Sequence, residues 1–355
     1  MITFDGVRKV FPDGTVAVDN LDLELPTGKI TVFVGPSGCG KTTSLRMINR
    51  MIEPTSGRIL IDGDDVTSQD DALLRRRIGY VIQHAGLFPH RTIAENIATV
   101  PHLNGVNKKK ARAVALELMD RVGLDESMAD RYPVQLSGGQ QQRVGVARAL
   151  AADPPVMLMD EPFSAVDPIV REVLQAEFLR IQGELGKTIA LVTHDIDEAI
   201  KIGDMVAVFR QGGHLAQFAT PQELLERPAN DFVADFVGRD RGFRSLSFDT
   251  AAALEVDDLF SVATGGEVLV LDGAGHPHGW TGPGLGSTSN PTPLGGTFVT
   301  GDSLRLVTDL AISSPVGIAV RVDETGRADG VLRHDSLVRQ LNARRRRRAE
   351  AESTS

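Results

Sequence analysis

The sequence contains very little cysteine and few aromatic residues. Cys39 is the only cysteine in 355 residues, which excludes an internal disulfide and fits a reducing compartment. Aromatic residues make up only 5% of the chain, which argues against a stacking surface for nucleic-acid bases. The net charge of −9 also disfavours contact with a phosphate backbone. We therefore expect no nucleic-acid partner.

Long apolar runs are absent as well. No run approaches the roughly 18 residues that a membrane-spanning helix needs. The first residues lack the basic and then apolar pattern of a signal peptide. We expect a chain that neither spans a membrane nor is exported, so any membrane role must come through a protein partner. The length of 355 residues allows one large domain and a smaller one.

What the chain does contain is a glycine-rich stretch that follows the phosphate-binding pattern G-x-x-x-x-G-K-[ST]. The apolar run at 29–34 predicts a buried strand before it, and 43–48 predicts the start of a helix after it. Glycines let the backbone aim N–H groups at phosphate oxygens, and the helix N-terminus adds its dipole. Lys41 is expected at the β- and γ-phosphates, and the Thr42 hydroxyl on Mg²⁺. The predicted nucleotide-binding residues of this stretch are Gly35, Pro36, Ser37, Gly38, Cys39, Gly40, Lys41, Thr42 and Thr43.

Strands and helices then alternate along the chain. The first 34 residues are β-rich, and the pattern from about 84 to 155 is mainly helical. An apolar strand at 156–159 is followed by a helix at about 168–184 and a strand at 188–193. Polar residues follow these strands, which predicts an α/β nucleotide-binding core.

Polar residues at three places narrow the range of reactions expected for this nucleotide site. Ser137 is placed as the N-cap of a second helix whose first turn would suit an anion, and Gly139 and Gln140 lie in that turn. At the end of a strand, Asp160 would hold Mg²⁺ through water and Glu161 would polarise the attacking water. His194 ends the next strand, where a neutral imidazole could bond the γ-phosphate.

This ordered set resembles the ATP-binding subunit of an ABC transporter over roughly residues 1–240. The resemblance implies a P-loop ABC ATPase domain with a RecA-like core, an antiparallel β subdomain and a helical subdomain at about 84–155. It also implies that Gln83 reaches Mg²⁺ and relays to a transmembrane partner. The loop 164–167, with Asp167 at the nucleotide, would cross to a second subunit. Phe11 falls where the family stacks an aromatic ring, more often Tyr, on adenine.

In the family that the chain resembles, ATP lies between two subunits arranged head to tail. Ser137, Gly139 and Gln140 of one subunit would face the γ-phosphate that Lys41 of the other holds. Hydrolysis removes most of that bridge and reopens the dimer. The resemblance also implies permease subunits as partners, an extracytoplasmic substrate-binding protein as an indirect one, and a place on the cytoplasmic face of the membrane.

Three local segments, 49–57, 75–83 and 86–92, are similar to importers of quaternary amines such as glycine betaine, carnitine or choline. One alternative is an importer of methionine, polyamines or sugars. A second is an ABC ATPase of translation or DNA repair without a membrane partner, although such proteins usually carry two cassettes or a long insertion. A third is a P-loop kinase, for which residues 137–140 supply no phosphoryl acceptor site.

The composition changes after about residue 240. Residues 241–340 resemble a degenerate pair of CBS regulatory modules, because the pattern D-x-x-G-x-x-x-G at 272–279 recurs at 323–330. Two unrelated β-hairpins are the alternative. The segment 281–297 is rich in Gly, Pro, Ser and Thr and is expected to be a linker or long loop. The basic tail 341–355, with its arginine run, is expected to be disordered.

Overall fold

The structure is a computed structural model, and it describes residues 1–83, 86–164, 166–259 and 266–353. Positions outside these ranges include the start of the expected helical subdomain, residue 165 of the expected crossing loop, part of the expected CBS-like region and the end of the tail. The chain divides into two compact units, Met1–Gly238 and Arg239–Ser355, and each is described by itself.

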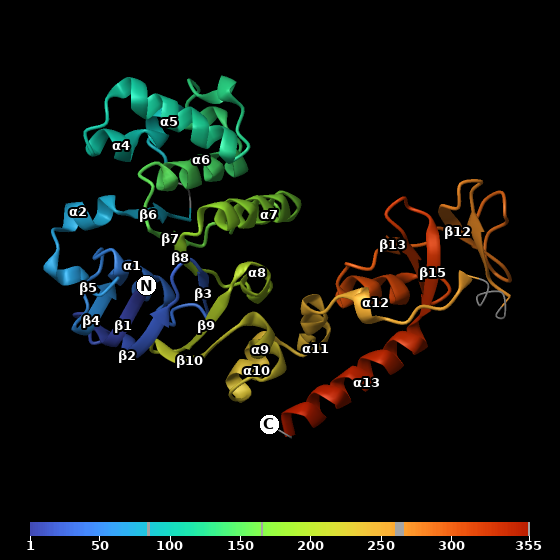
Figure 1. Ribbon diagram of the computed structural model, residues 1–355. Helices are drawn as coiled ribbons and strands as arrows, with labels where there is room; N and C mark the ends of the chain where they lie inside the picture. Colours follow the sequence, from blue (N-terminus) through green and yellow to red (C-terminus); the bar gives the residue numbers. More distant parts are fainter. Residues whose placement is uncertain (84–85, 165, 260–265, 354–355) are drawn as a thin grey trace. The chain divides into compact units, whose positions relative to one another are not determined.

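A six-stranded sheet forms the centre of the first unit, with the order β10-β9-β3-β8-β7-β6 among the described residues (Figure 1). Its strands are β3 (Ile30–Val34), β6 (Ile78–Val81), β7 (Val156–Asp160), β8 (Thr188–Val192), β9 (Met205–Arg210) and β10 (His214–Ala219). Only β10 is antiparallel to its neighbour. The strands β3, β7 and β8 are buried at every residue, as expected for parallel strands covered on both faces. Their carboxyl ends therefore meet at one edge of the sheet.

A second, antiparallel sheet with the order β2-β1-β4-β5 packs beside the first. Its strands are β1 (Ile2–Val10), β2 (Val16–Leu25), β4 (Ser56–Ile61) and β5 (Asp64–Asp65). Alternate residues of β3 join different cores. Phe33 packs in the hydrophobic cluster of this second sheet, whereas Val32 and Val34 belong to a cluster built with helices. Because successive side chains of β3 point to opposite faces, this strand packs against both hydrophobic clusters.

Helices cover the six-stranded sheet and extend from it. The helices associated with the sheet are α1 (Lys41–Ile48), α2 (Asp71–Arg76), α7 (Pro168–Leu185), α8 (Ile196–Ile202), α9 (Pro221–Glu226) and α10 (Asp231–Val237). Between β6 and β7 the chain forms α3 (Ile93–Ile97), α4 (Thr99–Leu103), α5 (Lys108–Arg121) and α6 (Gly138–Leu150). The helices α4, α5 and α6 lie together in Figure 1. Short 3₁₀ turns lie at Val66–Ser68, Glu126–Met128 and Pro133–Gln135.

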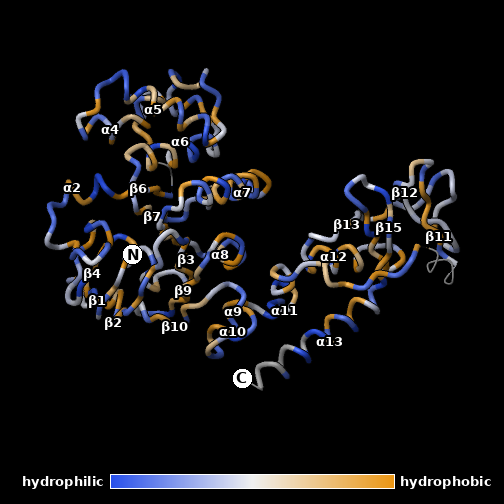
Figure 2. The backbone as a smooth tube through the Cα atoms, viewed as in Figure 1, coloured by the Kyte–Doolittle hydropathy of each residue, from blue (hydrophilic) through white to orange (hydrophobic). Residues whose placement is uncertain are grey.

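The second unit combines two hairpins with helices. Its elements are α11 (Arg241–Arg244), the 3₁₀ turns Ser245–Phe248 and Ala251–Ala253, β11 (Val268–Leu271), β12 (Pro277–Thr281), β13 (Thr297–Phe298), α12 (Leu304–Ser313), β14 (Ile318–Val322), β15 (Ala328–Arg333) and α13 (His334–Ser353). The core-facing residues of α12 appear as orange stretches of the tube in Figure 2. The repeated motif forms two hairpins with the same turn. Asp272 and Asp323 each accept two backbone N–H groups through Oδ1.

The segment 281–297 is a long loop, one of the two forms expected for it. Trp280 and Thr292 exchange backbone hydrogen bonds of 2.7 and 2.9 Å, which close residues 281–291 of that loop. A different expectation for this unit needs correction. The tail is helical to Ser353 rather than disordered. Buried Leu337 anchors the start of α13 in the hydrophobic core, and the Arg, Ala and Glu residues that follow are strong helix formers.

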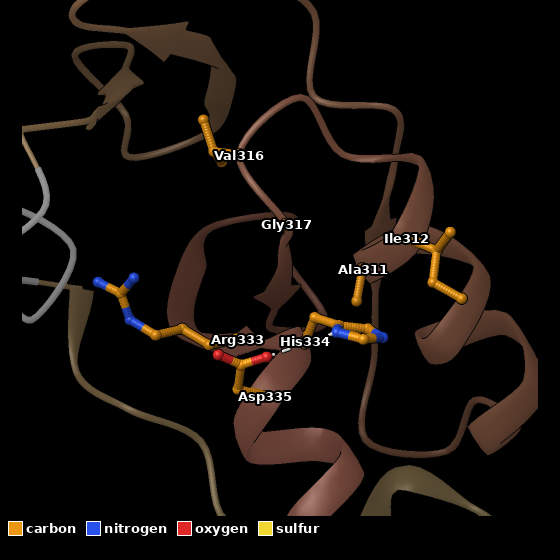
Figure 3. A pocket seen from close by; sticks show the side chains of 7 residues that line it. All are labelled: Ala311, Ile312, Val316, Gly317, Arg333, His334 and Asp335. Atoms are coloured by element: carbon orange, nitrogen blue, oxygen red, sulfur yellow. Dashed lines mark ion pairs between the residues drawn. The ribbon is translucent and has the colours of Figure 1, made fainter.

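A cavity of about 430 Å³ in the second unit lies beside the start of α13, where the His334 imidazole and the Asp335 carboxylate are 3.7 Å apart (Figure 3). No helix among the described residues is both long enough and apolar enough to cross a bilayer.

Candidate nucleotide site

The phosphate loop connects the end of β3 to the start of α1. Gly35, Gly38 and Gly40 have φ angles of 149°, 75° and 98°. A Cβ on Gly35 would approach the Phe209 carbonyl oxygen to 2.2 Å, and one on Gly40 would approach the Ala17 carbonyl oxygen to the same distance. Only glycine allows the loop to turn this tightly while lying against neighbouring backbone.

Lys41 and Thr42 begin α1 and face different partners. The Lys41 ammonium lies within the loop and donates to the carbonyl oxygens of Gly35 and Pro36 at 2.8 and 2.9 Å. The Thr42 hydroxyl donates to Asp160 Oδ1, at the end of β7, at 2.9 Å. A hydroxyl and a carboxylate joined in this way are hard oxygen donors of the kind that Mg²⁺ prefers.

Arg46 is a neighbour of Asp160 that the sequence analysis missed. Its Nη2 lies 3.3 Å from Asp160 Oδ2, so the carboxylate is held from both sides. Asp160 is only 7% exposed, and a buried carboxylate needs such partners. The available signal was the spacing of four between Thr42 and Arg46, which places both on one face of α1.

Two predicted residues from distant parts of the sequence converge on the carboxylate of a third, Glu161. Glu161 Oε2 accepts a hydrogen bond from Gln83 Nε2 at 3.1 Å and lies 3.3 Å from His194 Nδ1. Glu161 also has a φ of 48°, a left-handed conformation that is rare outside glycine. Such backbone strain is concentrated at functional sites. The geometry suits a base that is oriented by an amide and an imidazole.

A cavity of about 400 Å³ joins these parts. Its lining residues are Phe11, Thr15, Ala17, Ser37, Gly38, Cys39, Gly40, Lys41, Thr42, Thr43, Glu161 and His194. The volume falls in the range of small-molecule sites. The Phe11 ring lies at this cavity, with the Lys9 ammonium 5.3 Å from its centre. The loop, the lysine and the oxygen donors fit a magnesium nucleotide.

The predicted anion-binding residues of α6 do not join this cavity in the described part of a single chain. Ser137 caps α6, accepting from the Gln140 N–H at 3.3 Å while the Gln140 side chain accepts from the Ser137 N–H at 2.9 Å. Gly139 follows in the first turn of α6, where an added Cβ would lie 3.3 Å from Val170. Asp167 caps α7 through the Ile169 N–H at 3.0 Å. Ser137, Gly139 and Asp167 therefore lie outside the lining of this cavity.

Comparison with known proteins identifies the family. The ABC transporter family model matches residues 18–164. The chain is 46% identical to the osmoprotectant import ATP-binding protein OsmV of Salmonella typhimurium, across 94% of this chain and 93% of that one. The chain belongs to the ABC transporter ATP-binding subunits. It is also 54% identical to the carnitine transport ATP-binding protein OpuCA of Listeria monocytogenes, over 68% of this chain and 60% of that protein.

Among solved structures, this ABC subunit is similar to a dimeric ATP-binding cassette in a post-hydrolysis state bound to ADP and phosphate. The identity is 33% and the TM-score is 0.56, over 62% of this chain and 99% of that one. The P-loop ABC ATPase fold and the role of ATP hydrolysis in import, both expected from the motifs, are therefore confirmed.

Proposed function

We propose that two copies of this chain bind two magnesium-ATP molecules head to tail, and that hydrolysis separates them. The supporting observation is the split site. One chain places Lys41, Thr42 and Glu161 around a cavity, whereas Ser137 and Gly139 lie at another helix N-terminus. Two such anion-binding ends can hold one triphosphate between them. Loss of the γ-phosphate removes that bridge and shifts the population toward the open state.

Within this proposal each residue has a role in the reaction. Thr42, Asp160 and Gln83 would hold Mg²⁺, which neutralises charge on the phosphates when it is bound. Glu161 would orient and polarise the attacking water, and His194 would contact the γ-phosphate. Phe11 would stack on adenine.

The substitution Glu161→Gln tests the proposal. The amide keeps the shape of the side chain but cannot act as a base, so ATP should bind normally and trap a dimer. Light scattering at saturating magnesium-ATP should give twice the monomer mass, with hydrolysis reduced by about two orders of magnitude or more. The variant Lys41→Ala, which weakens ATP binding, is the monomeric control. Hydrolysis at the wild-type rate, or a monomer at saturating ATP, would contradict the role of Glu161.

We further propose that the dimer drives a membrane permease at the cytoplasmic face, and that the solute is a quaternary amine delivered by an extracytoplasmic receptor. The segments 49–57, 75–83 and 86–92 support this solute class, as do the names of the OsmV and OpuCA relatives. Co-purification with the permease, followed by uptake of labelled glycine betaine into proteoliposomes, tests it. Unlabelled choline and carnitine should compete, whereas methionine and spermidine should not.

For the second unit we propose a CBS-like regulatory role. Support comes from the two hairpins with one turn geometry, which Asp272 and Asp323 organise in the same way. The resemblance to CBS modules implies such a repeated strand–turn–strand unit. The unit would adjust transport without supplying any residue to the ATP cavity.

A further inference from the structure

The side chain of Arg171, near the start of α7, contacts two segments that the reaction uses. Its Nη2 donates to the Val166 carbonyl oxygen at 3.2 Å, within the loop that follows Glu161. Its Nη1 lies 3.7 Å from Asp195 Oδ2, next to His194. One guanidinium therefore connects the loop expected to cross to the second subunit with the segment that carries His194.

The surroundings of Arg171 hold this fork in place. The backbone N–H of Arg171 donates to the Asp167 carbonyl oxygen at 2.8 Å, so its helix turn begins on the same loop. Its side chain is 29% exposed, and its Nε is buried with no hydrogen-bond partner among the described residues. A guanidinium that is partly buried in this way loses part of its hydration. The contacts with the Val166 carbonyl oxygen and with Asp195 offset that loss.

A second polar contact joins the same helices one turn further along. Gln175 Nε2 donates to Glu198 Oε1 at 3.1 Å, and the Glu198 side chain is buried. The backbone N–H groups of Asp197 and Glu198 donate to Asp195 Oδ1 at 2.9 and 3.3 Å. The α7–α8 seam therefore fixes the residue directly after His194 from several directions.

We propose that Arg171 is a positioning residue that makes the loop residues 166–167 and the segment 193–195 move together. The inference rests on the proposed dimer, in which that loop reaches the partner subunit while His194 serves its own ATP. A displacement of the loop by one subunit would then reach the histidine of the other through one side chain. Arg171 does not line the ATP cavity, so its effect falls on catalysis rather than on nucleotide affinity.

Two substitutions in the full-length chain separate this role from ordinary stabilisation. Arg171→Met removes both contacts and keeps the apolar stem. Asp195→Asn removes only the ion pair, because the amide oxygen still caps α8 at the Oδ1 position. Arg180→Met is the matched control, since Arg180 lies on the same helix and pairs with Glu177 and Glu184 of that helix.

We expect Arg171→Met and Asp195→Asn each to lower kcat about tenfold, with KM and the Kd of a fluorescent ATP analogue unchanged within about twofold. The double variant should be no slower than the slower single variant, because the two residues act as a unit. Arg180→Met should stay near wild type. A wild-type kcat in Arg171→Met, multiplicative losses in the double variant, or a parallel loss of nucleotide affinity would each overturn the proposal.

Hydrogen exchange without nucleotide separates this inference from the proposed function. Arg171→Met should raise exchange together in peptides covering 162–168 and 193–198, and Arg180→Met should raise neither. If the wild type fails to hydrolyse ATP, the proposed function is wrong. Hydrogen exchange would still show whether Arg171 couples the two segments. Faster exchange in only one of the two segments, or in neither, contradicts the link even if hydrolysis is normal.

Discussion

At the scale of single residues, Glu161 carries the clearest sign of function. Its left-handed φ of 48° costs on the order of 1–3 kcal/mol. That backbone turn is held by the Glu161 N–H, which donates to the Val192 carbonyl oxygen at 2.9 Å. The side chain is consequently aimed between Gln83 and His194. This backbone turn therefore suits the role of base that we propose for Glu161.

Cys39 gives a prediction at the same scale. Burial raises the pKa of the Cys39 thiol, and the nearby Lys41 ammonium only partly opposes this. Because the thiolate is the reactive form, alkylation by iodoacetamide should be slow at neutral pH and accelerate steadily above about pH 9. Magnesium-ATP should slow it further, since Cys39 lines the cavity. Mass spectrometry of the labelled peptide measures the rate.

Alkylated Cys39 should also block the ATP cavity by its size. The ATPase activity should fall in proportion to the labelled fraction, and Cys39→Ser should remain active and resist the reagent. Full activity after complete labelling would show that this thiol does not border the nucleotide.

At the scale of elements, capping and turn chemistry decide where helices and hairpins begin. Ser137 and Gln140 form a reciprocal cap on α6. The two Asp-led turns of the second unit lie against each other, since the Ala328 N–H donates to the Gly275 carbonyl oxygen at 3.0 Å. His276 extends this contact. Its Nδ1 lies 3.0 Å from Asp272 Oδ2, and its Nε2 lies 3.2 Å from the Thr325 carbonyl oxygen.

This hairpin contact should depend on pH. The Asp272 carboxylate, followed by the Thr325 carbonyl, raises the pKa of His276, and the hydrogen bond from the His276 side chain lowers the pKa of Asp272. Stability from His276 is full below its ordinary pKa of about 6.5 and is lost as pH rises through the raised value. Stability from Asp272 is present above about pH 3.9 and is lost on acidification. The contact should be strongest between these limits.

Thermal unfolding of the second unit in His276→Gln tests this pH dependence. The loss of stability relative to wild type should be larger near pH 6 than near pH 9. His278→Gln is the control, because its Nε2 lies farther from the same carboxylate, at 3.8 Å. Equal losses of stability for His276→Gln at both pH values would show that the positive charge of His276 does not hold the hairpins together.

At the scale of the whole molecule, the two units have separate hydrophobic cores. The clusters of the first unit and those of the second share no residue. The residues lining the ATP cavity all belong to Met1–Gly238. The first unit therefore holds every described residue that lines this cavity, and the regulatory role of the second unit stays a proposal.

Deleting Arg239–Ser355 should consequently spare basal ATP hydrolysis, with kcat within about twofold of the full chain. The truncated protein should unfold cooperatively, as circular dichroism can measure, and the Lys41→Ala version of it should be inactive. Transport in proteoliposomes should lose its regulation. A folded truncated protein without ATPase activity would show that the second unit is part of the catalytic machinery.

The sequence by itself predicted the phosphate loop, the strand-end residues Asp160 and Glu161 and the cap at Ser137. Each of these depends on residues close together in the chain, so their spacing indicates it. The family came from the resemblance of the whole ordered set of motifs. The local sequence pattern did not predict the helix in the tail. That helix, α13, is supported by the packing of Leu337 in a core formed by residues far from it in the chain.

Only the tertiary structure decided which residues, distant in the chain, contact the Glu161 carboxylate and the Arg171 guanidinium. Gln83, Glu161 and His194 meet because three parallel strands end at one edge of a sheet, and no periodicity encodes that edge. Arg171 likewise has the pattern of an ordinary helix residue until the fold brings the loop and the segment 193–195 to its two ends. Long-range contacts depend on how layers pack, whereas motifs depend only on neighbours in the chain.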